Sequence, residues 1–224
     1  DCGTVSTDMF MHHRLPIDDP NRYFARSFID KKEPTVFFNT VKFEVPLPEL
    51  DQPRIKGIVI HAILQQLADN SRDTNPDSID RHAQRLLRMH RFPGALVERT
   101  ANDITNTMIA VMQDPRGQWI LSSNHPSHHS EYAMTTCIDG KMHQHIIDRL
   151  IIDENNTAWI IDYKTTSPTA NEDRAAFTQA AKAQHEPQLK RYHDALALHV
   201  DCPVKVALYF PTCLAWMSWS YAPH

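Results

Sequence analysis

Two residues at the end of an apolar run carry opposite charges that are expected to point the same way. In the segment "WIIDYKTT", residues 159–166, a single residue separates Asp162 from Lys164. Side chains alternate between the two faces of a strand, so Asp162 and Lys164 should share one face and Tyr163 the other. On an exposed strand end the two would be an ordinary surface ion pair that contributes little to stability. At a buried edge, the same pair is typical of a catalytic site.

A second carboxylate stands at a comparable place on the preceding strand. Asp148 follows two isoleucines, just as Asp162 does, and "DENN" at 153–156 predicts a tight turn that joins the two segments as a hairpin. Two acids on paired strands repel each other unless a cation lies between them. Oxygen donors of this kind suit Mg²⁺ or Mn²⁺. Lys164 would then lie beside the metal, where an ammonium can orient a water molecule and offset negative charge in a transition state.

The elements that must position these residues form an α/β pattern. The second half of the chain predicts strands at 130–139, 144–153, 157–165, 204–210 and 213–219, with helices at 172–184 and 186–200. Their order indicates a mixed central sheet flanked by helices. The chain has no GxxxxGK[ST] phosphate loop, so it is not expected to be an ATPase by itself.

The first half of the chain is expected to be mostly helical. Apolar residues recur at helical spacing over 54–70, 77–91 and 94–112. Residues 1–50 contain scattered prolines and one strand-like run at 35–45, and we interpret them as a connecting segment packed on the core. Residues 51–224 are expected to form the main domain.

Composition limits the class of protein. The 224 residues have a formal net charge of −4, which excludes a globally basic nucleic-acid binder. Four scattered cysteines and the absence of a long apolar run predict a cytoplasmic protein without a membrane span. The sequence opens at Asp1 without an initiator Met, which is compatible with a piece of a longer polypeptide or a processed product. A local basic cluster remains open to two interpretations, a solvated helix face or a phosphate-tracking surface. It comprises Arg81, His82, Arg85, Arg88, His90 and Arg91.

The motifs together resemble a known family. They are "GIVIH" at 57–61, Glu131, "DR" at 148–149, "DYKT" at 162–165 and "QLKRY" at 188–192. In this order they are similar to the motifs of RecB-like nucleases in the PD-(D/E)XK superfamily. The resemblance implies a restriction-endonuclease-like core over roughly 54–219. It also implies a nuclease domain of the kind found in AddA- or RecB-type helicase–nucleases, or a separate exonuclease.

The resemblance implies a metal site with four contributors. His61, Asp148 and Asp162, with the main-chain carbonyl of Tyr163, would hold Mg²⁺ or Mn²⁺. His61 lies one helical turn after Gly57, whose missing side chain would let the helix approach the sheet closely.

Three further residues are carried over as catalytic candidates. Glu131 would accept a proton, help to hold a second metal, or pair with Arg149. Gln188 and Tyr192 are four residues apart on one helix face, where they would bind a phosphate or brace the Lys164 strand. Without the resemblance, both are equally typical of polar residues at the rim of a packed helix.

Other positions depart from the family pattern. His145 stands where relatives often have Gly, and it would either crowd the site or contribute to it. Cys202 and Cys213 do not have the spacing of an iron–sulfur cluster, so none is expected. The run His125 to His129 is interpreted as a histidine-rich loop without zinc.

The sequence and the resemblance therefore predict a metal-dependent DNA nuclease that leaves a 5′-phosphate, and an exonuclease is expected rather than an endonuclease. Single-stranded DNA ends and helicase domains, in the same chain or a partner subunit, are the expected partners. One alternative is an inactive nuclease fold that serves as a scaffold or a DNA-end clamp. Another is a restriction- or resolvase-like enzyme with duplex specificity.

Overall fold

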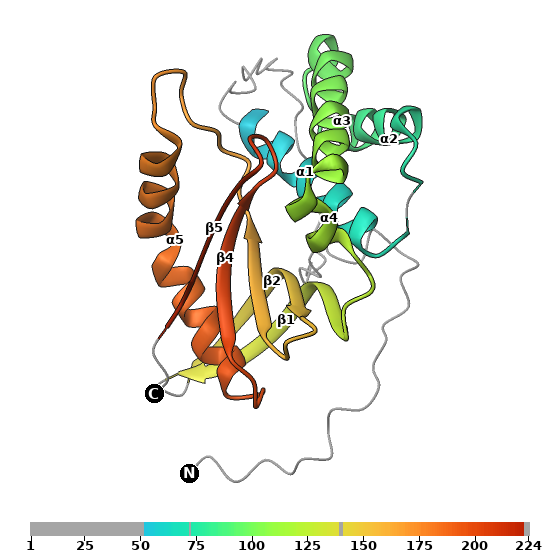
Figure 1. The fold of residues 1–224 in the computed structure, drawn as a ribbon. Helices are drawn as coiled ribbons and strands as arrows, with labels where there is room; N and C mark the ends of the chain where they lie inside the picture. Colours follow the sequence, from blue (N-terminus) through green and yellow to red (C-terminus); the bar gives the residue numbers. More distant parts are fainter. Residues whose placement is uncertain (1–51, 72, 139–140, 222–224) are drawn as a thin grey trace, which may run out of the picture. The chain divides into compact units, whose positions relative to one another are not determined.

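A five-stranded mixed sheet forms the centre of the molecule in the computed structural model, which describes residues 52–71, 73–138 and 141–221 (Figure 1). Its strands, in spatial as well as chain order, are β1 (Ser127–Ile138), β2 (Lys141–Ile152), β3 (Ala158–Tyr163), β4 (Val204–Phe210) and β5 (Ala215–Ser220). Neighbouring strands are antiparallel except β3 and β4, which are parallel. The chain returns between these two through a helix, as parallel pairing requires.

Helices cover both faces of the sheet. They are α1 (Gln52–Ala68), α2 (Pro76–Met89), α3 (Val97–Gln113), α4 (Pro115–Leu121) and α5 (Arg174–Ala197), with a 3-10 turn at Gly94–Leu96. Helices α1 to α4 gather on one side of the sheet and α5 lies alone on the other (Figure 1). The mixed sheet with flanking helices confirms the α/β class expected from the sequence. None of the described helices is long and apolar enough to cross a bilayer.

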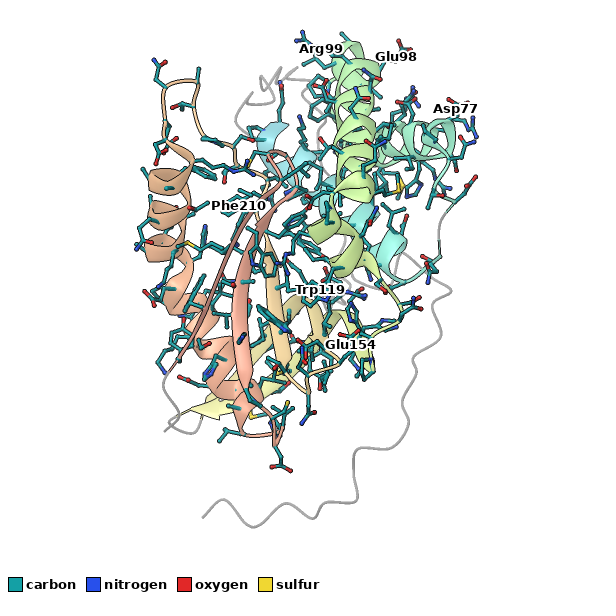
Figure 2. The ribbon with its side chains drawn as sticks, in the orientation of Figure 1. Asp77, Glu98, Arg99, Trp119, Glu154 and Phe210 are labelled. Atoms are coloured by element: carbon teal, nitrogen blue, oxygen red, sulfur yellow. The ribbon has the colours of Figure 1, made fainter. Side chains whose placement is uncertain are left out.

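Each face of the sheet has its own hydrophobic core, because alternate strand residues point to opposite sides. Ile161 and Tyr163 pack with α1 to α4, whereas Ile160 and Phe210 pack with α5. Among the residues labelled in Figure 2, Trp119 of α4 packs against the core on the α1 to α4 side, and Phe210 of β4 belongs to the core on the α5 side. The alternation in "WIIDYKTT" therefore places Asp162 on the α5 side of the sheet, the face that Ile160 shares.

Three sequence expectations need correction. The two helices expected at 172–184 and 186–200 are one helix, α5, which continues through Pro187. Proline removes one backbone hydrogen bond there, but Leu189 and other apolar residues on both sides of it are buried against the sheet. Helix α4 was not expected, although Asp114 caps it and Pro115 stands at its first position. The histidine run is not simply a loop, since β1 begins at Ser127.

The β1–β2 hairpin changes faces partway along its length. Ser130 pairs with Arg149 and Tyr132 pairs with Ile147, but the intervening pair has no ladder contact. Arg149 bonds to α4, whereas Tyr132 and Ile147 pack in the α5 core. Between these pairs, Glu131 has a φ of 48°, a left-handed backbone that is rare outside glycine. The hairpin thus rotates at Glu131, so that Arg149 and Ile147, which would share a face in a regular strand, point to opposite sides of the sheet.

The expected segment at 1–50, including its strand-like run at 35–45, lies outside the described residues. The division into 1–50 and 51–224 stays a prediction.

Candidate active site

Asp148 lies where the β2–β3 ladder stops. The last paired residues are Arg149 and Ile161, so the next pair in register would be Asp148 and Asp162. Instead, the Asp148 Oδ2 atom accepts a hydrogen bond of 2.7 Å from the backbone N–H of Tyr163. The carboxylate therefore replaces the ladder bond, and the two strands separate around it.

The same bond orients the main chain of Tyr163. In a strand, the N–H and C=O of one residue point towards the same neighbouring strand. Since the Tyr163 N–H points towards Asp148, its carbonyl is directed to the same gap between β2 and β3. The phenol ring of Tyr163 is buried on the opposite side, in the α1 to α4 core. The Tyr163 carbonyl therefore points into the gap where it was expected to contribute to a metal site.

Asp162 is a buried carboxylate with a cationic neighbour. Lys164 Nζ lies 2.6 Å from Asp162 Oδ2, and the two side chains are 21% and 7% exposed. Asp162 Oδ2 has no well-aligned hydrogen bond, although the distance is that of a close ion pair. Burial, then the negative charge of Asp148, raises the pKa of Asp162 to about 6 against the opposing effect of Lys164. The pair is not an exposed surface ion pair.

His61 reaches this gap from α1. Its Nδ1 atom lies 3.5 Å from Asp148 Oδ1, and its ring meets the Tyr163 ring edge to face at 5.7 Å. Burial lowers the pKa of His61, but the hydrogen bond and charge of Asp148, with the charges of Asp162 and Glu131, outweigh burial and raise it. The three nearby carboxylates thus stabilise the protonated form of the His61 imidazole.

Gly57 explains how α1 comes so close. A Cβ atom added at Gly57 would lie 3.1 Å from Thr165 Oγ1, tighter than most such contacts. The helix therefore rests almost directly on the "DYKT" segment, one turn before His61. The close approach that the glycine predicted is present.

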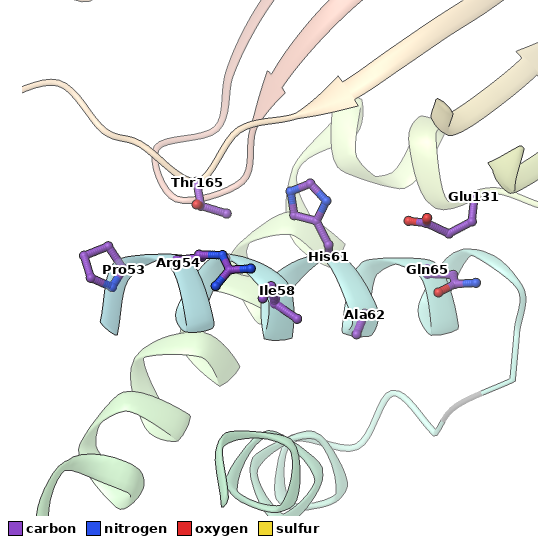
Figure 3. Close-up of a pocket in the computed structure, with 9 residues that line it drawn as sticks. Pro53, Arg54, Ile58, His61, Ala62, Gln65, Glu131 and Thr165 are labelled. Atoms are coloured by element: carbon purple, nitrogen blue, oxygen red, sulfur yellow. The ribbon is translucent and has the colours of Figure 1, made fainter. Parts of the chain in front are cut away.

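Glu131 completes the group of acids. It lies beside His61 in a pocket of about 450 Å³ along α1, between β1 and Thr165 (Figure 3). Burial and the charge of Asp148 raise the pKa of Glu131, while His61 opposes that shift. Extension of the strand registers puts Glu131, Asp148 and Asp162 in one row across three strands. One of the roles expected for Glu131 was an ion pair with Arg149.

Arg149 has other partners. Its guanidinium is fully buried and donates to the carbonyls of Ile120 and Ser122 and to the hydroxyl of Ser130. It also lies 3.9 Å from Asp69. Four partners from the ends of α1 and α4 and from β1 satisfy a charge that would otherwise be costly to bury. Arg149 thus joins β2 to the helical layer.

Gln188 and Tyr192 contact each other. The Gln188 amide donates to the Tyr192 hydroxyl at 2.8 Å, and the Tyr192 ring packs edge to face on His145 at 5.5 Å. His145 is itself buried and bonds to Thr136. This arrangement favours bracing of α5 against β2. Whether Gln188 and Tyr192 also contact substrate stays a prediction.

Sequence reasoning missed two residues one turn earlier on α5. Gln184 and His185 line a pocket of about 530 Å³ that also contains His61 and Lys164. They precede Gln188 by four and three residues, so helical spacing places them near the same face. The spacing from Gln188 could have indicated both residues, but neither belongs to the "QLKRY" motif.

The residues at the gap fit a divalent metal in their chemistry. Carboxylates, a carbonyl and an imidazole are suitable donors. Burial and then the negative charge of Asp148 raise the pKa of Asp162, so a bound cation would favour its ionised form. As arranged in the described part of the chain, no three His, Cys, Asp or Glu side chains enclose an ion site. Asp148 is held by Tyr163 and His61, and Asp162 by Lys164. Small side-chain rotations would be needed to bring the donors onto one ion.

The basic cluster on α2 is separate from this gap. Arg81, Arg85, Arg88 and Arg91 are exposed, and α2 packs against α1 and α3. Both interpretations of the cluster, a solvated face or a phosphate-tracking surface, remain open.

Comparison with known proteins agrees with the fold. The described fold is a mixed α/β sheet that carries Asp148 and the Asp162-x-Lys164 pair at the ends of two neighbouring strands. A family model described as "PD-(D/E)XK nuclease superfamily" matches residues 22–213, most of the chain. The chain belongs to this superfamily.

Solved structures give a weaker likeness. One titled "Crystal structure of SSO0001" has 13% sequence identity and a TM-score of 0.32, and the match covers 76% of this chain and 80% of that one. A similarity at this level says nothing about activity. No curated protein matches the chain significantly.

Proposed function

We propose that the chain is a Mg²⁺- or Mn²⁺-dependent deoxyribonuclease of RecB-like type. The observation that carries the proposal is the convergence of His61, Asp148, Asp162 and Lys164 at the point where β2 and β3 separate. Membership of a nuclease superfamily supports the reaction class. The arrangement of the four residues supports this site as the place where the reaction occurs.

Each residue has a role that follows from its contacts. Asp148, Asp162 and His61, with the Tyr163 carbonyl, would hold the metal, which when bound supplies positive charge to the phosphate that is attacked. Lys164 then has its partner Asp162 engaged elsewhere, and its ammonium can orient the attacking water and offset charge on the phosphate oxygens. Glu131, the outermost acid of the row, is placed to accept a proton. Cleavage on the 3′-oxygen side leaves a 5′-phosphate.

The substrate proposed is the end of a single DNA strand. With a net charge of −4, the chain has little overall attraction for polyanions. Weak affinity suits an exonuclease domain that receives its strand from helicase domains, in the same chain or in a partner subunit. We therefore propose a role in DNA repair or recombination and a cytoplasmic location.

A cleavage assay tests the proposal. Labelled single-stranded, duplex and branched DNA would be incubated with Mg²⁺, Mn²⁺ or EDTA. We expect metal-dependent degradation of single strands, loss of that activity in Asp162→Ala, and a folded variant by circular dichroism. Mg²⁺-dependent activity close to wild type in Asp162→Ala would refute the assignment of the site.

One observation favours a second candidate, an inactive scaffold or DNA-end clamp. Each aspartate already has a basic protein neighbour, His61 beside Asp148 and Lys164 beside Asp162. A domain of that kind would bind DNA ends in EDTA as tightly as in Mg²⁺ and cleave none of the substrates above. The same assay therefore separates the two functions.

A further inference from the structure

A pocket of about 530 Å³ opens beside Lys164, between α5 and the segment that follows β3. Its near wall contains His61, Lys164 and Thr165 of the candidate active site, and its far wall is formed by α5. The volume falls within the range of about 300–1,000 Å³ that small-molecule pockets usually have. Neither the metal site nor the roles proposed above use the α5 wall.

The α5 wall combines an apolar floor with a polar rim. Phe177, Ala180 and Ala181 form the floor, and Gln184 and His185 follow them one turn later. Phe177 is buried and packs on Phe210 with 4.9 Å between ring centroids, so its position is fixed by the core. A rigid apolar surface bordered by a few hydrogen-bonding groups is the usual construction of a site for a flat, polar-edged ligand.

The charges around the pocket suit a ligand attached to a phosphate. Lys164 supplies a positive charge on one wall, and Glu172 is the acid on the other. Burial and the nearby Lys164 charge lower the pKa of His185, which makes the neutral imidazole its main form near pH 7. A neutral imidazole offers one donor and one acceptor, as the amide of Gln184 also does. Such groups can pair with the edge of a nucleobase.

We propose that this pocket is the subsite for the nucleoside next to the phosphate that is cleaved. The base would lie on Phe177, Ala180 and Ala181, with Gln184 and His185 bonded to its polar edge and Lys164 beside the phosphate. This inference rests on the nuclease function proposed above and adds to it the position of a nucleotide. The occupant is a nucleoside of single-stranded DNA, since a paired base could not enter a pocket in the protein.

The test compares two pairs of variants of the full chain. Ala180→Leu fills the floor of the pocket, and Ala183→Leu places the same side chain at another exposed position of α5 outside it. His185→Ala removes a rim group, and Gln179→Ala is its exposed control on the same helix. Leucine and alanine are both good helix formers, so the four variants should retain α5.

Two quantities are measured for each variant. The first is the Kd for a short fluorescent single-stranded oligodeoxynucleotide in EDTA, where cleavage is absent. The second is the kcat and KM for the same strand with Mg²⁺. A matching strand whose terminal nucleosides lack their bases reports whether the base itself is bound.

We expect Ala180→Leu and His185→Ala to raise Kd and KM by about 10-fold or more, the scale expected when base stacking or a hydrogen bond is lost. The two controls should match wild type, and kcat should change little in all four. The strand with abasic ends should bind wild type as weakly as the intact strand binds Ala180→Leu. The His185→Asn variant keeps a hydrogen-bond donor and an acceptor at this position, so it should bind the strand more tightly than His185→Ala.

The failures of the two proposals are distinguishable. If wild type cleaves DNA and Ala180→Leu behaves like Ala183→Leu, the nucleoside subsite is wrong and the nuclease function stands. If wild type does not cleave but binds the single strand, and Ala180→Leu raises the Kd of that binding, the subsite stands and the nuclease function is wrong. If wild type neither cleaves nor binds, both are overturned.

Discussion

At the scale of single residues, each aspartate at the gap has its own basic neighbour that can offset its charge. His61 lies next to Asp148, and Lys164 lies next to Asp162. A bound metal would take over this neutralisation and leave Lys164 available for another partner. Lys164 is therefore the residue whose role differs most between a structural ion pair and a catalytic site.

Lys164→Met tests that difference. If Lys164 orients the water, the substitution should reduce cleavage by about two to four orders of magnitude, as expected for the loss of a charged or proton-transferring catalytic group. Metal affinity should persist, because the histidine and both aspartates remain. Cleavage and Mn²⁺ binding would be measured on the same preparation, with Lys190→Met, which breaks the exposed Lys190–Asp194 pair, as the control. Normal cleavage by folded Lys164→Met would show that "DYKT" is not the catalytic edge.

Asp162 should give the protein an unusual dependence of stability on pH. Its pKa is about 6 in the folded state against 3.8 when unfolded, so the folded state binds more protons between pH 4 and 6. Stability from this group is therefore present below about pH 4 and is lost as the pH rises to about 6. Asp162→Asn should remove this dependence and make the metal-free protein more stable at pH 7.5, by roughly 1 to 3 kcal/mol.

Denaturant unfolding in EDTA at pH 4.5 and pH 7.5 measures this effect. Asp201→Asn, at an exposed position, is the control and should follow wild type. An Asp162→Asn protein that is less stable than wild type at pH 7.5 would show that the Lys164 pair outweighs burial.

At the scale of elements, the site depends on one helix that rests on one strand extension. Helix α1 brings His61 to the gap only because Gly57 lets it lie against Thr165. The contact is made by a side chain at the end of the "DYKT" motif, so the position of the helix and the position of Lys164 are coupled. A change at either surface should be felt at the metal donors.

Gly57→Ala tests this coupling. Alanine favours the helix by about 1 kcal/mol, so stability should be unchanged or improved. The added methyl group would press on Thr165 Oγ1 and shift His61, and we expect cleavage to fall by about 10-fold. Thr165→Ala removes the atom that obstructs it. The double variant should recover cleavage to the level of Thr165→Ala alone, and a cycle with additive losses would show that the two positions are not coupled.

At the scale of the whole molecule, much of the fold could be predicted from local sequence. The strand "VKVALYF" coincides with β4, and the turn at 153–156 joins β2 to β3 because Asp153 accepts bonds from two backbone N–H groups in the turn. Those signals are local. The motif order also brought His61, Asp148 and Asp162 to the same region, although their arrangement around one ion is still a prediction.

Other features depend on contacts that no local pattern contains. The left-handed backbone of Glu131 could not be predicted locally, because residue 131 is neither glycine nor asparagine; it occurs where the strand side chains change faces of the sheet. The continuity of α5 through Pro187 likewise reflects burial on both sides of the proline. Tertiary packing decided both features against local preference.

Metal binding should stabilise the whole molecule if the gap is its site. An ion that binds only the folded state raises the free energy of unfolding by about 2.7 kcal/mol at 100 times its Kd. We therefore expect Mg²⁺ or Mn²⁺ to raise the Tm of wild type in a concentration-dependent way. Asp148→Asn and Asp162→Asn should lose this response, whereas Asp103→Asn, in the Lys56 pair away from the gap, should keep it. An equal response in all four proteins would place the ion elsewhere.

The rotation of the β1–β2 hairpin at Glu131 has a consequence for how the protein unfolds. Arg149 bonds this hairpin to the helical layer, whereas Met134, Ile147 and Leu150 of the same hairpin belong to the α5 core. Neither layer can detach without breaking the same pair of strands, so the two cores should melt as one cooperative unit. The amide protons of α1 and α5 that exchange only through global opening should then report the same free energy of opening.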